Sequence, residues 1–347
     1  MFCRLWPSKA MNVGLIGTGA IAHKHAQSYQ QIGYWLVAVS NRSEEKGRGF
    51  ANEYGAEFVA DHRDLCARRD IDYLDICAFP DSRLEMAQAA ASNGKHVLVQ
   101  KPIAVTLGDA RAMLDCCSEA DVSLGVISQH RFDDSTIFLR QALEQGRLGK
   151  ILQADAYVKW HRPQAYYDRL GKGSWSVEGG GALINQGIHA LDLMLYLAGP
   201  IKEVYAQWQL AAAHKMESDD VVTGVIRYAS GATGVIQAST AVFPGYSERI
   251  EIHGTNGSAI ITGDRLTAWD VEGDSGEEAP LAVDVDSGAS DPMAISLEPI
   301  KRQLLDFGKA VREHRKPLVD GEEGYRTLEV VLALYDSARS GHVVRIS

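Results

Sequence analysis

Short apolar runs alternate with amphipathic stretches over the first third of the chain. The amphipathic stretches carry apolar residues at helical spacing, whereas the runs between them are rich in Val, Ile and Leu, which is typical of buried parallel strands. This alternation predicts a parallel sheet covered by helices. The expected strands are 11–16, 35–40, 57–60, 73–78, 96–100 and 123–128, and the expected helices are 21–32, 43–54, 65–69, 83–93 and 106–121.

From about residue 130 the pattern changes. Alternating apolar and polar residues, with turn signals at Ser230-Gly231 and Asn256-Gly257, predict a mostly antiparallel sheet with one face on a helix layer. The fold class is therefore α/β, and we expect a disordered extension at 1–10, a nucleotide-binding domain at 11–130 and a second domain at 131–347. Its expected strands are 151–160, 203–210, 221–228, 234–242, 249–253 and 259–262, its helices 137–146, 182–198, 299–314 and 324–340, and a solvated loop is expected at 273–291.

Composition narrows the class of protein. Lys and Arg number 35 against 45 for Asp and Glu, and the net charge of −10 argues against nucleic acid or an anionic membrane as the main partner. No apolar run of about 18 residues is present, and the N-terminus lacks the apolar core of a signal peptide. The five cysteines have no C-x-x-C spacing, so neither disulfides nor a zinc site are expected. These features predict a cytoplasmic protein.

A glycine motif joins the first expected strand to the first expected helix. Gly17-x-Gly19-x-x-Ala22 has the spacing of a dinucleotide-binding turn: Gly17 permits the tight turn, Gly19 lets the backbone approach a pyrophosphate, and Ala22 lets the helix pack closely. The helix N-terminus favours the phosphate charge. We expect the cofactor to contact Gly17, Thr18, Gly19, Ala20 and Ile21.

The end of the second strand bears on the choice of cofactor. An acidic residue there would bind the ribose 2′-hydroxyl of NAD, but this chain has Ser40-Asn41-Arg42. A hydroxyl, an amide and a guanidinium suit a 2′-phosphate, so NADP is preferred and NAD remains possible. The alternative is that Arg42 is only a solvated charge opening the next helix.

Two polar clusters are candidates for the chemistry. Lys101 directly follows a strand, where ligands bind in parallel sheets, although many lysines in such turns are simply exposed. In the expected helix 182–198, which follows three glycines, Asn185, His189 and Asp192 share one face. His189 could instead be a hydrogen-bonded core histidine. His189 and Asp192 could also ligate a cation, but a second set of ligands is missing, so no metal is expected.

These motifs, in this order, resemble the Gfo/Idh/MocA family of NAD(P)-dependent sugar and cyclitol oxidoreductases. The resemblance covers nearly all of 11–347 and rests on the glycine motif, 94–97 leading into Gln100-Lys101-Pro102, Arg131-Phe132, and 179–192. It implies an N-terminal Rossmann domain and a C-terminal α+β domain whose open, mostly antiparallel sheet often serves oligomerisation, here as a homodimer or homotetramer. It also implies cofactor contacts at Phe79, Pro80, Gln100 and Lys101, and catalytic roles for Lys101 and His189.

The chain departs from the family pattern at several positions. Gln100 stands where Glu is usual, so any ribose contact comes from a neutral amide. Asn185 stands where many members have Asp, and an amide cannot act as a base. Asp81 and Leu84 replace an Asn and a His, which puts the local cofactor contacts in doubt.

The hypothesis for the reaction is hydride transfer between nicotinamide and a secondary alcohol of a sugar-like molecule. His189 is expected to be the base, kept neutral by the helix N-terminus, with Lys101 stabilising the alkoxide in the same cavity. Asn185 would orient the hydroxyl and Asp192 would orient His189. The alternatives are an NADP-binding sensor without catalysis and a nicotinamide-dependent glycosidase. Besides Asn185 and His189, the sugar is expected to contact Arg131, Trp160, Arg162, Tyr166, Tyr167 and Trp175.

Overall fold

The computed structural model describes residues 10–211, 213–276, 279–280 and 296–346. Almost all of the expected extension at 1–10, and most of the expected loop at 273–291, lie outside the described residues. The chain divides into two compact units. The first comprises the described residues up to Ile103, Gly108–Ile127 and Ile300–Glu322, and the second comprises Ala104–Leu107, Ser128–Pro299 and the chain from Glu323.

The first unit is built on a parallel sheet of six strands. Its order, β3-β2-β1-β4-β5-β6, reverses direction between β1 and β4, which is the doubly wound arrangement of dinucleotide-binding domains. The strands are β1 (Asn12–Ile16), β2 (Trp35–Ser40), β3 (Glu57–Val59), β4 (Tyr73–Ile76), β5 (His96–Val99) and β6 (Leu124–Val126). The expected Rossmann domain is confirmed.

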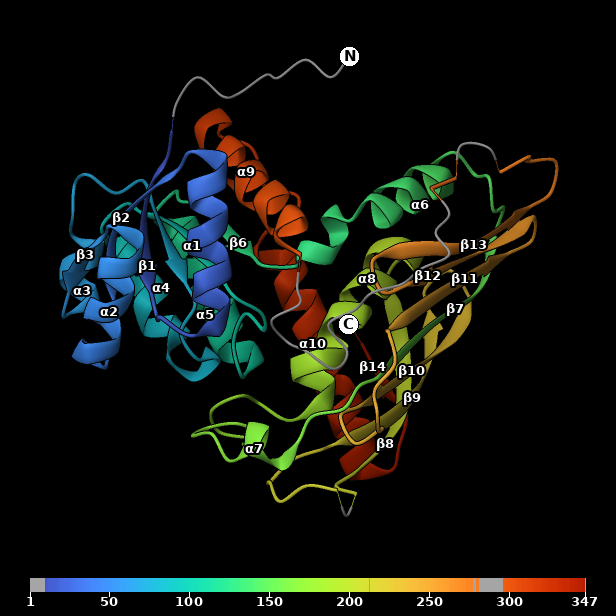
Figure 1. The fold of residues 1–347 in the computed structure, drawn as a ribbon. Helices are drawn as coiled ribbons and strands as arrows, with labels where there is room; N and C mark the ends of the chain where they lie inside the picture. The colour runs from blue at the N-terminus through green and yellow to red at the C-terminus, as the bar shows by residue number, and fades with distance from the viewer. Residues whose placement is uncertain (1–9, 212, 277–278, 281–295, 347) are drawn as a thin grey trace. The chain divides into compact units, whose positions relative to one another are not determined.

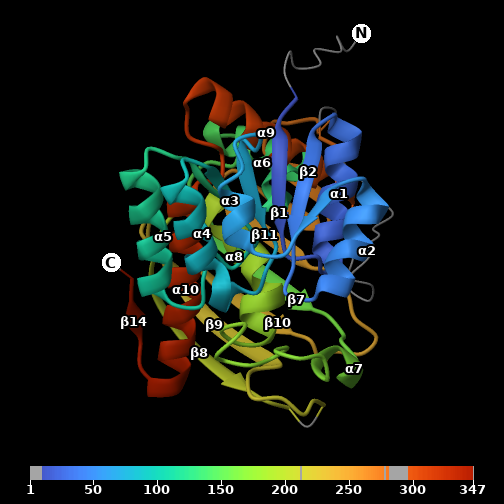
Figure 2. The same cartoon turned by 90° about the vertical axis from the view of Figure 1, so that its left-hand side faces the viewer.

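Helices cover both faces of this sheet. The chain runs outward in one direction from β1 to β3 and in the opposite direction from β4 to β6. Because such crossover connections are right-handed, α1 and α2 lie on one face of the sheet and α4 and α5 lie on the other (Figure 2). The helices are α1 (Ala20–Ile32), α2 (Glu44–Tyr54), α3 (His62–Cys66), the short 3-10 turn η1 (Pro80–Ser82), α4 (Arg83–Ser92) and α5 (Leu107–Glu119). The carboxyl ends of β1 and β4 are therefore left open to a ligand.

A late segment of the chain completes the first unit. The helix α9 (Leu297–Glu313) brings Phe307 against Tyr73, with ring centroids 5.2 Å apart. Both aromatic side chains are buried. The sequence predicts a single boundary near residue 130, but this packing assigns Ile300–Glu322 to the first unit instead.

The second unit is built on an eight-stranded mixed sheet, ordered β13-β12-β11-β7-β10-β9-β8-β14 (Figure 1). The pair β7 and β10 is parallel and the other pairs are antiparallel, so the expected open, mostly antiparallel sheet is confirmed. The strands are β7 (Ile151–Lys159), β8 (Ile201–Gln209), β9 (Val221–Tyr228), β10 (Thr233–Ser239), β11 (Arg249–Gly254), β12 (Gly257–Thr262), β13 (Arg265–Val271) and β14 (Val344–Arg345). The sequence patterns missed β13 and β14.

One face of the second sheet is buried and the other is exposed, as the alternating burial along β8 and β9 shows. Helix α8 packs against β7 and β11 on the buried face. The helical elements of this unit are η2 (Gln129–Phe132), α6 (Asp134–Glu144), α7 (Gln164–Tyr167), η3 (Leu183–Gly187), α8 (Ile188–Ala198) and α10 (Gly321–Ser340). None of the helices within the described ranges is both long and apolar enough to cross a membrane.

Candidate active site

The glycine turn of the first unit has the geometry of a dinucleotide cradle. Gly17 has a φ of 92°, and a Cβ atom there would lie 2.8 Å from the backbone nitrogen of Ala78, so only glycine fits. Gly19 is the N-cap of α1 and offers no side-chain cap, and a Cβ atom there would meet nothing within 4 Å. The space beside Gly19 at the start of α1 is therefore open, which fits the close approach of a pyrophosphate.

The three residues at the end of β2 are placed differently from one another. The Ser40 hydroxyl donates to the carbonyl of Ala60 at 3.5 Å. The Asn41 amide accepts a hydrogen bond from the backbone N–H of Thr18 at 3.4 Å and donates to the carbonyl of Ser43 at 2.9 Å. Arg42 is exposed. Asn41 therefore holds the glycine turn, and Arg42 is the residue of the three that presents its side chain to solvent.

The turn after β5 is held from beneath by a buried guanidinium. Arg83 donates to the carbonyl of Ala78 at 2.9 Å and to the carbonyls of Gln100 and Pro102. Gln100 is buried, whereas Lys101 is partly exposed at the carboxyl end of the sheet. Of the other expected cofactor contacts, Phe79 is partly exposed and Pro80 is buried.

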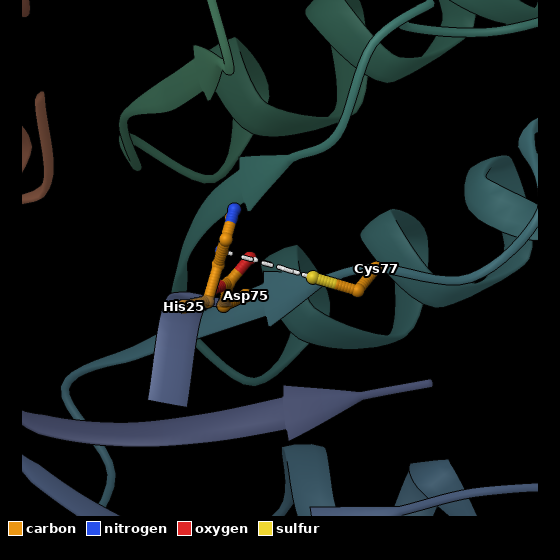
Figure 3. Close-up of side chains that lie close together, drawn as sticks. All are labelled: His25, Asp75 and Cys77. Carbon is orange, nitrogen blue, oxygen red and sulfur yellow. Dashed lines mark hydrogen bonds and ion pairs between the residues drawn. The ribbon is translucent and has the colours of Figure 1, made fainter. Parts of the chain in front are cut away.

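A cluster of potential metal ligands, of which His25 and Asp75 are buried and Cys77 is partly buried, joins α1 to the end of β4 (Figure 3). His25 Nδ1, Asp75 and Cys77 Sγ lie within 4.8 Å of one another. However, His25 Nδ1 is only 2.6 Å from Asp75 Oδ2, a distance at which the two atoms share a proton. Burial also raises the pKa of the Cys77 thiol well above its usual value, which disfavours the thiolate that a metal needs. The cluster is a hydrogen-bonded network.

In the second unit, Asp219 accepts hydrogen bonds from the start of the helix that follows the three glycines. Its Oδ1 accepts from the N–H of Gly181 at 2.8 Å, its Oδ2 from the N–H of Leu183 at 2.9 Å, and its carbonyl from the N–H of Ala182 at 2.8 Å. Tyr335 also donates to Oδ1 at 2.7 Å. Burial raises the pKa of Asp219 to about 6. A carboxylate therefore occupies this helix N-terminus, so the helix dipole is not available to keep His189 neutral as the sequence analysis expects.

The helix itself differs from the expected one. The segment Leu183–Gly187 is a π-helical turn, and α8 begins only at Ile188. A π turn has more residues than an α turn, so the position of Asn185 relative to His189 differs from the one its spacing predicts, whereas His189 and Asp192 both lie in α8 and keep their i, i+3 relation. Between residues 181 and 194, only Asn185 and His189 are not buried. The structure therefore leaves these two polar side chains partly exposed, whereas Asp192 is buried.

Asp192 and Arg131 form a buried ion pair. Arg131 donates from Nη2 to Asp192 Oδ1 at 2.7 Å and from Nε to Oδ2 at 2.8 Å, while its Nη1 reaches Glu323 at 2.8 Å. The same carboxylate accepts from Ser128 and Thr327. The Arg131 side chain is 1 % exposed, so we correct two expectations: Arg131 ties α8 to η2 and α10 rather than holding a sugar, and Asp192 anchors Arg131 rather than orienting His189.

His130 lies beside His189. The two rings meet edge to face, with centroids 5.3 Å apart. His130 Nδ1 is 2.8 Å from Asp133 Oδ2. Although burial opposes the charged form, the Asp133 carboxylate raises the pKa of His130 to about 9. His130 is therefore held by Asp133 while its ring packs against the ring of His189.

The aromatic residues expected to hold the sugar are not equivalent. Tyr167 is buried, with its hydroxyl 2.6 Å from Thr240 Oγ1, and Trp175 donates to the carbonyl of Glu217 and packs on Tyr335. Tyr167 therefore supports the fold of the loop, whereas Trp175 is partly exposed and is held through its indole N–H. Trp160 and Tyr166 are partly exposed, and buried Arg162 lies over both rings.

An ion pair next to Asn185, whose acidic partner Glu178 is buried, was not predicted from the sequence. Glu178 pairs with Lys172, accepts from the N–H of Gly173 at 2.9 Å, and accepts from Asn185 Nδ2 at 3.2 Å. Burial opposes the Lys172 charge, but Tyr166 and Glu178 outweigh it and raise the pKa of Lys172. The signal in the sequence was a single acid directly before the three glycines, which spacing rules do not single out. Glu178 holds the amide nitrogen of Asn185 and so sets its orientation.

Comparison with known proteins agrees with this architecture. The model described as "Oxidoreductase family, NAD-binding Rossmann fold" matches residues 11–128, and that described as "GFO/IDH/MocA C-terminal domain" matches residues 137–260. An oxidoreductase with a Rossmann unit and an open-sheet unit is the class that the fold and the glycine turn define. The chain belongs to the Gfo/Idh/MocA family.

Relatives match over their full length. Myo-inositol 2-dehydrogenase of Thermotoga maritima is 28% identical, and the match covers 97% of this chain and 98% of the relative. The 1,5-anhydro-D-fructose reductase of Ensifer adhaerens is 28% identical over 96% of this chain and 98% of the relative. Among solved structures, the WlbA dehydrogenase of Bordetella pertussis in complex with NADH and UDP-GlcNAcA is 28% identical, with a TM-score of 0.87 over 98% of this chain and 99% of that one.

Proposed function

We propose that this chain is an NAD(P)-dependent dehydrogenase or reductase acting on a secondary alcohol of a sugar, glycoside, nucleotide sugar or cyclitol. The observation that carries the proposal is the pair Asn185 and His189, which alone reach the surface from an otherwise buried stretch of helix. Full-length relatives named as dehydrogenases and reductases of such molecules support it. When bound at the glycine turn, the nicotinamide cofactor supplies the hydride acceptor or donor.

In this proposal the protein moves the proton. His189 removes the hydroxyl proton during oxidation, and Asn185, whose amide nitrogen is held by Glu178, orients the substrate by accepting a hydrogen bond from a neighbouring hydroxyl through its amide oxygen. Lys101 stabilises the negative charge that develops on the substrate oxygen. Trp160, Arg162 and Tyr166 are the remaining candidates for contact with the sugar.

The test is a substrate screen with purified protein. Cyclitols, free sugars, glycosides and nucleotide sugars are offered with NAD or NADP, and the absorbance of the reduced cofactor is followed. We expect turnover with at least one group, and a loss of about 100-fold or more in Lys101→Ala, the low end for acid–base groups. Lys309→Ala, a lysine with a 60% exposed side chain on α9, is the matched control and should turn over normally. If the protein binds the cofactor but oxidises none of these classes of compound, the result would favour a non-catalytic sensor. Release of an aglycone from a glycoside would favour a glycosidase.

We also propose that NADP is preferred to NAD. Support comes from Arg42, which is exposed at the end of β2 while Asn41 holds the glycine turn. A guanidinium there can pair with a 2′-phosphate.

For the assembly, we propose a homodimer or homotetramer formed through the open sheet face. Tyr205, Val225 and Val235 lie side by side across β8, β9 and β10, and the first two are 37% and 53% exposed. An apolar row across an open sheet favours pairing with a second copy. Size-exclusion chromatography with light scattering should show an oligomer in the wild type and a smaller species in Val225→Glu. A cytoplasmic location is proposed as well, because the four described cysteines are free.

A further inference from the structure

Five groups of the first unit form one hydrogen-bonded chain that ends at Lys101. Tyr29 donates its hydroxyl proton to Asp75 Oδ2 at 2.7 Å, and His25 Nδ1 lies 2.6 Å from the same oxygen. On its other side, His25 Nε2 lies 2.8 Å from Gln100 Nε2, and Gln100 Oε1 accepts from the N–H of Lys101 at 3.3 Å. His25, Tyr29 and Asp75 have no exposed surface, and Gln100 is buried (Figure 3 shows His25 and Asp75).

The chain has one consistent assignment of protons. Asp75 is an acceptor for Tyr29, so the proton between Asp75 and His25 sits on Nδ1. Nε2 of a neutral imidazole then carries a lone pair, and it accepts from the amide nitrogen of Gln100. That leaves the amide oxygen of Gln100 for the N–H of Lys101. Each donor meets an acceptor, as buried polar groups require.

We propose that His25 is a positioning residue for Lys101: Asp75 holds it as the Nδ1–H tautomer, it fixes the Gln100 amide, and that amide fixes the peptide from which the Lys101 side chain leaves. The inference rests on the proposed function in one respect, because it takes Lys101 as the group that meets the substrate oxygen. Arg83 acts on the same turn from the carbonyl side, since it holds the carbonyls of Gln100 and Pro102.

The proposal explains why an amide fits at position 100. A carboxylate there would face the lone pair of His25 Nε2, and two acceptors repel. The pair could be satisfied only if His25 took up a second proton and became an imidazolium between two carboxylates. The other titratable groups facing His25 are Tyr29, Asp75 and Cys77, and Arg83 lies close enough to act on the Cys77 thiol. None of these supplies a proton to Nε2.

The experiment compares Gln100→Glu with Gln100→Leu, using ¹⁵N-histidine NMR and the pH dependence of kcat under saturating cofactor and substrate. The His25 signals are assigned by their loss in His25→Gln. In the wild type we expect a proton on Nδ1 of His25 and a lone pair on Nε2, as the chain of hydrogen bonds requires. In Gln100→Glu we expect Nε2 to take up a proton as well, because it then faces a carboxylate.

The kinetic arm separates positioning from folding. Gln100→Glu should lower kcat by about 10- to 100-fold at high pH, the cost of a misplaced catalytic group, and recover as His25 becomes protonated. Gln100→Leu should lose the same activity without recovery.

The inference would be overturned by a wild-type His25 that carries a proton on Nε2, or by identical pH profiles for the two variants. Equimolar zinc in the purified protein would also overturn it, because the metal would replace the proton. If a variant does not fold, the wild-type NMR still decides. Failure of the proposed function is seen separately, as normal turnover by Lys101→Ala.

Discussion

Two glycine-rich turns open helices in this protein, one in each unit, and they do opposite things. At Gly19, the helix N-terminus has no side-chain cap and the space beside the glycine is open. At Gly181, the N-terminus is gripped by the carboxylate and carbonyl of Asp219, and a Cβ atom would overlap that carbonyl oxygen. The first turn fits an anionic ligand, whereas at the second turn the carboxylate of Asp219 already occupies the helix N-terminus.

Glycines before a helix therefore do not by themselves indicate a phosphate-binding site. In the first unit Gly19 leaves room for a ligand, whereas in the second Gly181 lets the backbone of Asp219 approach the start of the helix. The consequence of the second arrangement is a rigid start for the stretch that carries Asn185 and His189. In the proposed function, cofactor binding and proton transfer belong to different turns.

Adding one methyl group to each turn gives the largest expected contrast. Gly181→Ala should lower the free energy of unfolding by at least about 3 kcal/mol, because the new Cβ atom collides with backbone. Gly19→Ala, the matched control, should change it by less than about 1 kcal/mol, since its φ of −78° suits alanine and nothing lies within 4 Å. It should, however, weaken cofactor binding by roughly 10-fold or more. Urea unfolding measures the stability of both variants, and cofactor titration measures binding. Equal losses of stability in Gly181→Ala and Gly19→Ala would contradict the difference between the two turns.

The pH dependence of stability should reveal the buried carboxylate of the second turn. Burial raises the pKa of Asp219 to about 6, above the value of about 3.9 for an unfolded Asp, so the folded state binds the extra proton. Its contribution is present below about pH 4 and is lost as the pH rises through 6, an effect on the order of 2 kcal/mol.

Urea unfolding from pH 4 to 7 should show this fall in the wild type and a smaller one in Asp219→Asn. Asp336→Asn, on a side chain that is 66% exposed, should follow the wild type. The same slope in all three proteins would remove Asp219 as the group that titrates.

The smallest expected effect concerns the choice between NADP and NAD at the first turn. Arg42→Ala should weaken NADPH binding by roughly 10-fold, the loss of one charge-assisted hydrogen bond, and leave NADH binding within about 2-fold. Stability should be unchanged because the side chain is exposed. Fluorescence titration of both reduced cofactors checks this, and parallel losses for the two would contradict the NADP preference.

The first unit could be predicted from sequence because its signals are local. A strand, a glycine turn and a helix follow one another within a few residues, and the glycine spacing encodes the turn itself. The second site could be predicted only in part. Asn185 and His189 were found from their glycine context, but the π turn arises from packing, and the grip of Asp219 joins residues almost forty positions apart.

The lack of a local signal also explains why the role expected for Arg131 differs from the contacts that the structure shows. Arg131 is polar and near an expected site, which favours a substrate contact, but its partners Asp192 and Glu323 come from α8 and α10. Spacing along the chain cannot reveal such pairing. The segment Ile300–Glu322 was likewise assigned to the wrong unit, since its apolar stripe shows that it is buried but not against which sheet.

The central claim is that one turn binds the cofactor while the other holds the base. It is tested most directly by the rate of nicotinamide reduction in His189→Ala at saturating cofactor, with a substrate identified in the screen. The account predicts a rate about 100-fold or more below that of the wild type, because the cofactor is still bound but the proton has no acceptor. A rate equal to that of the wild type would contradict it.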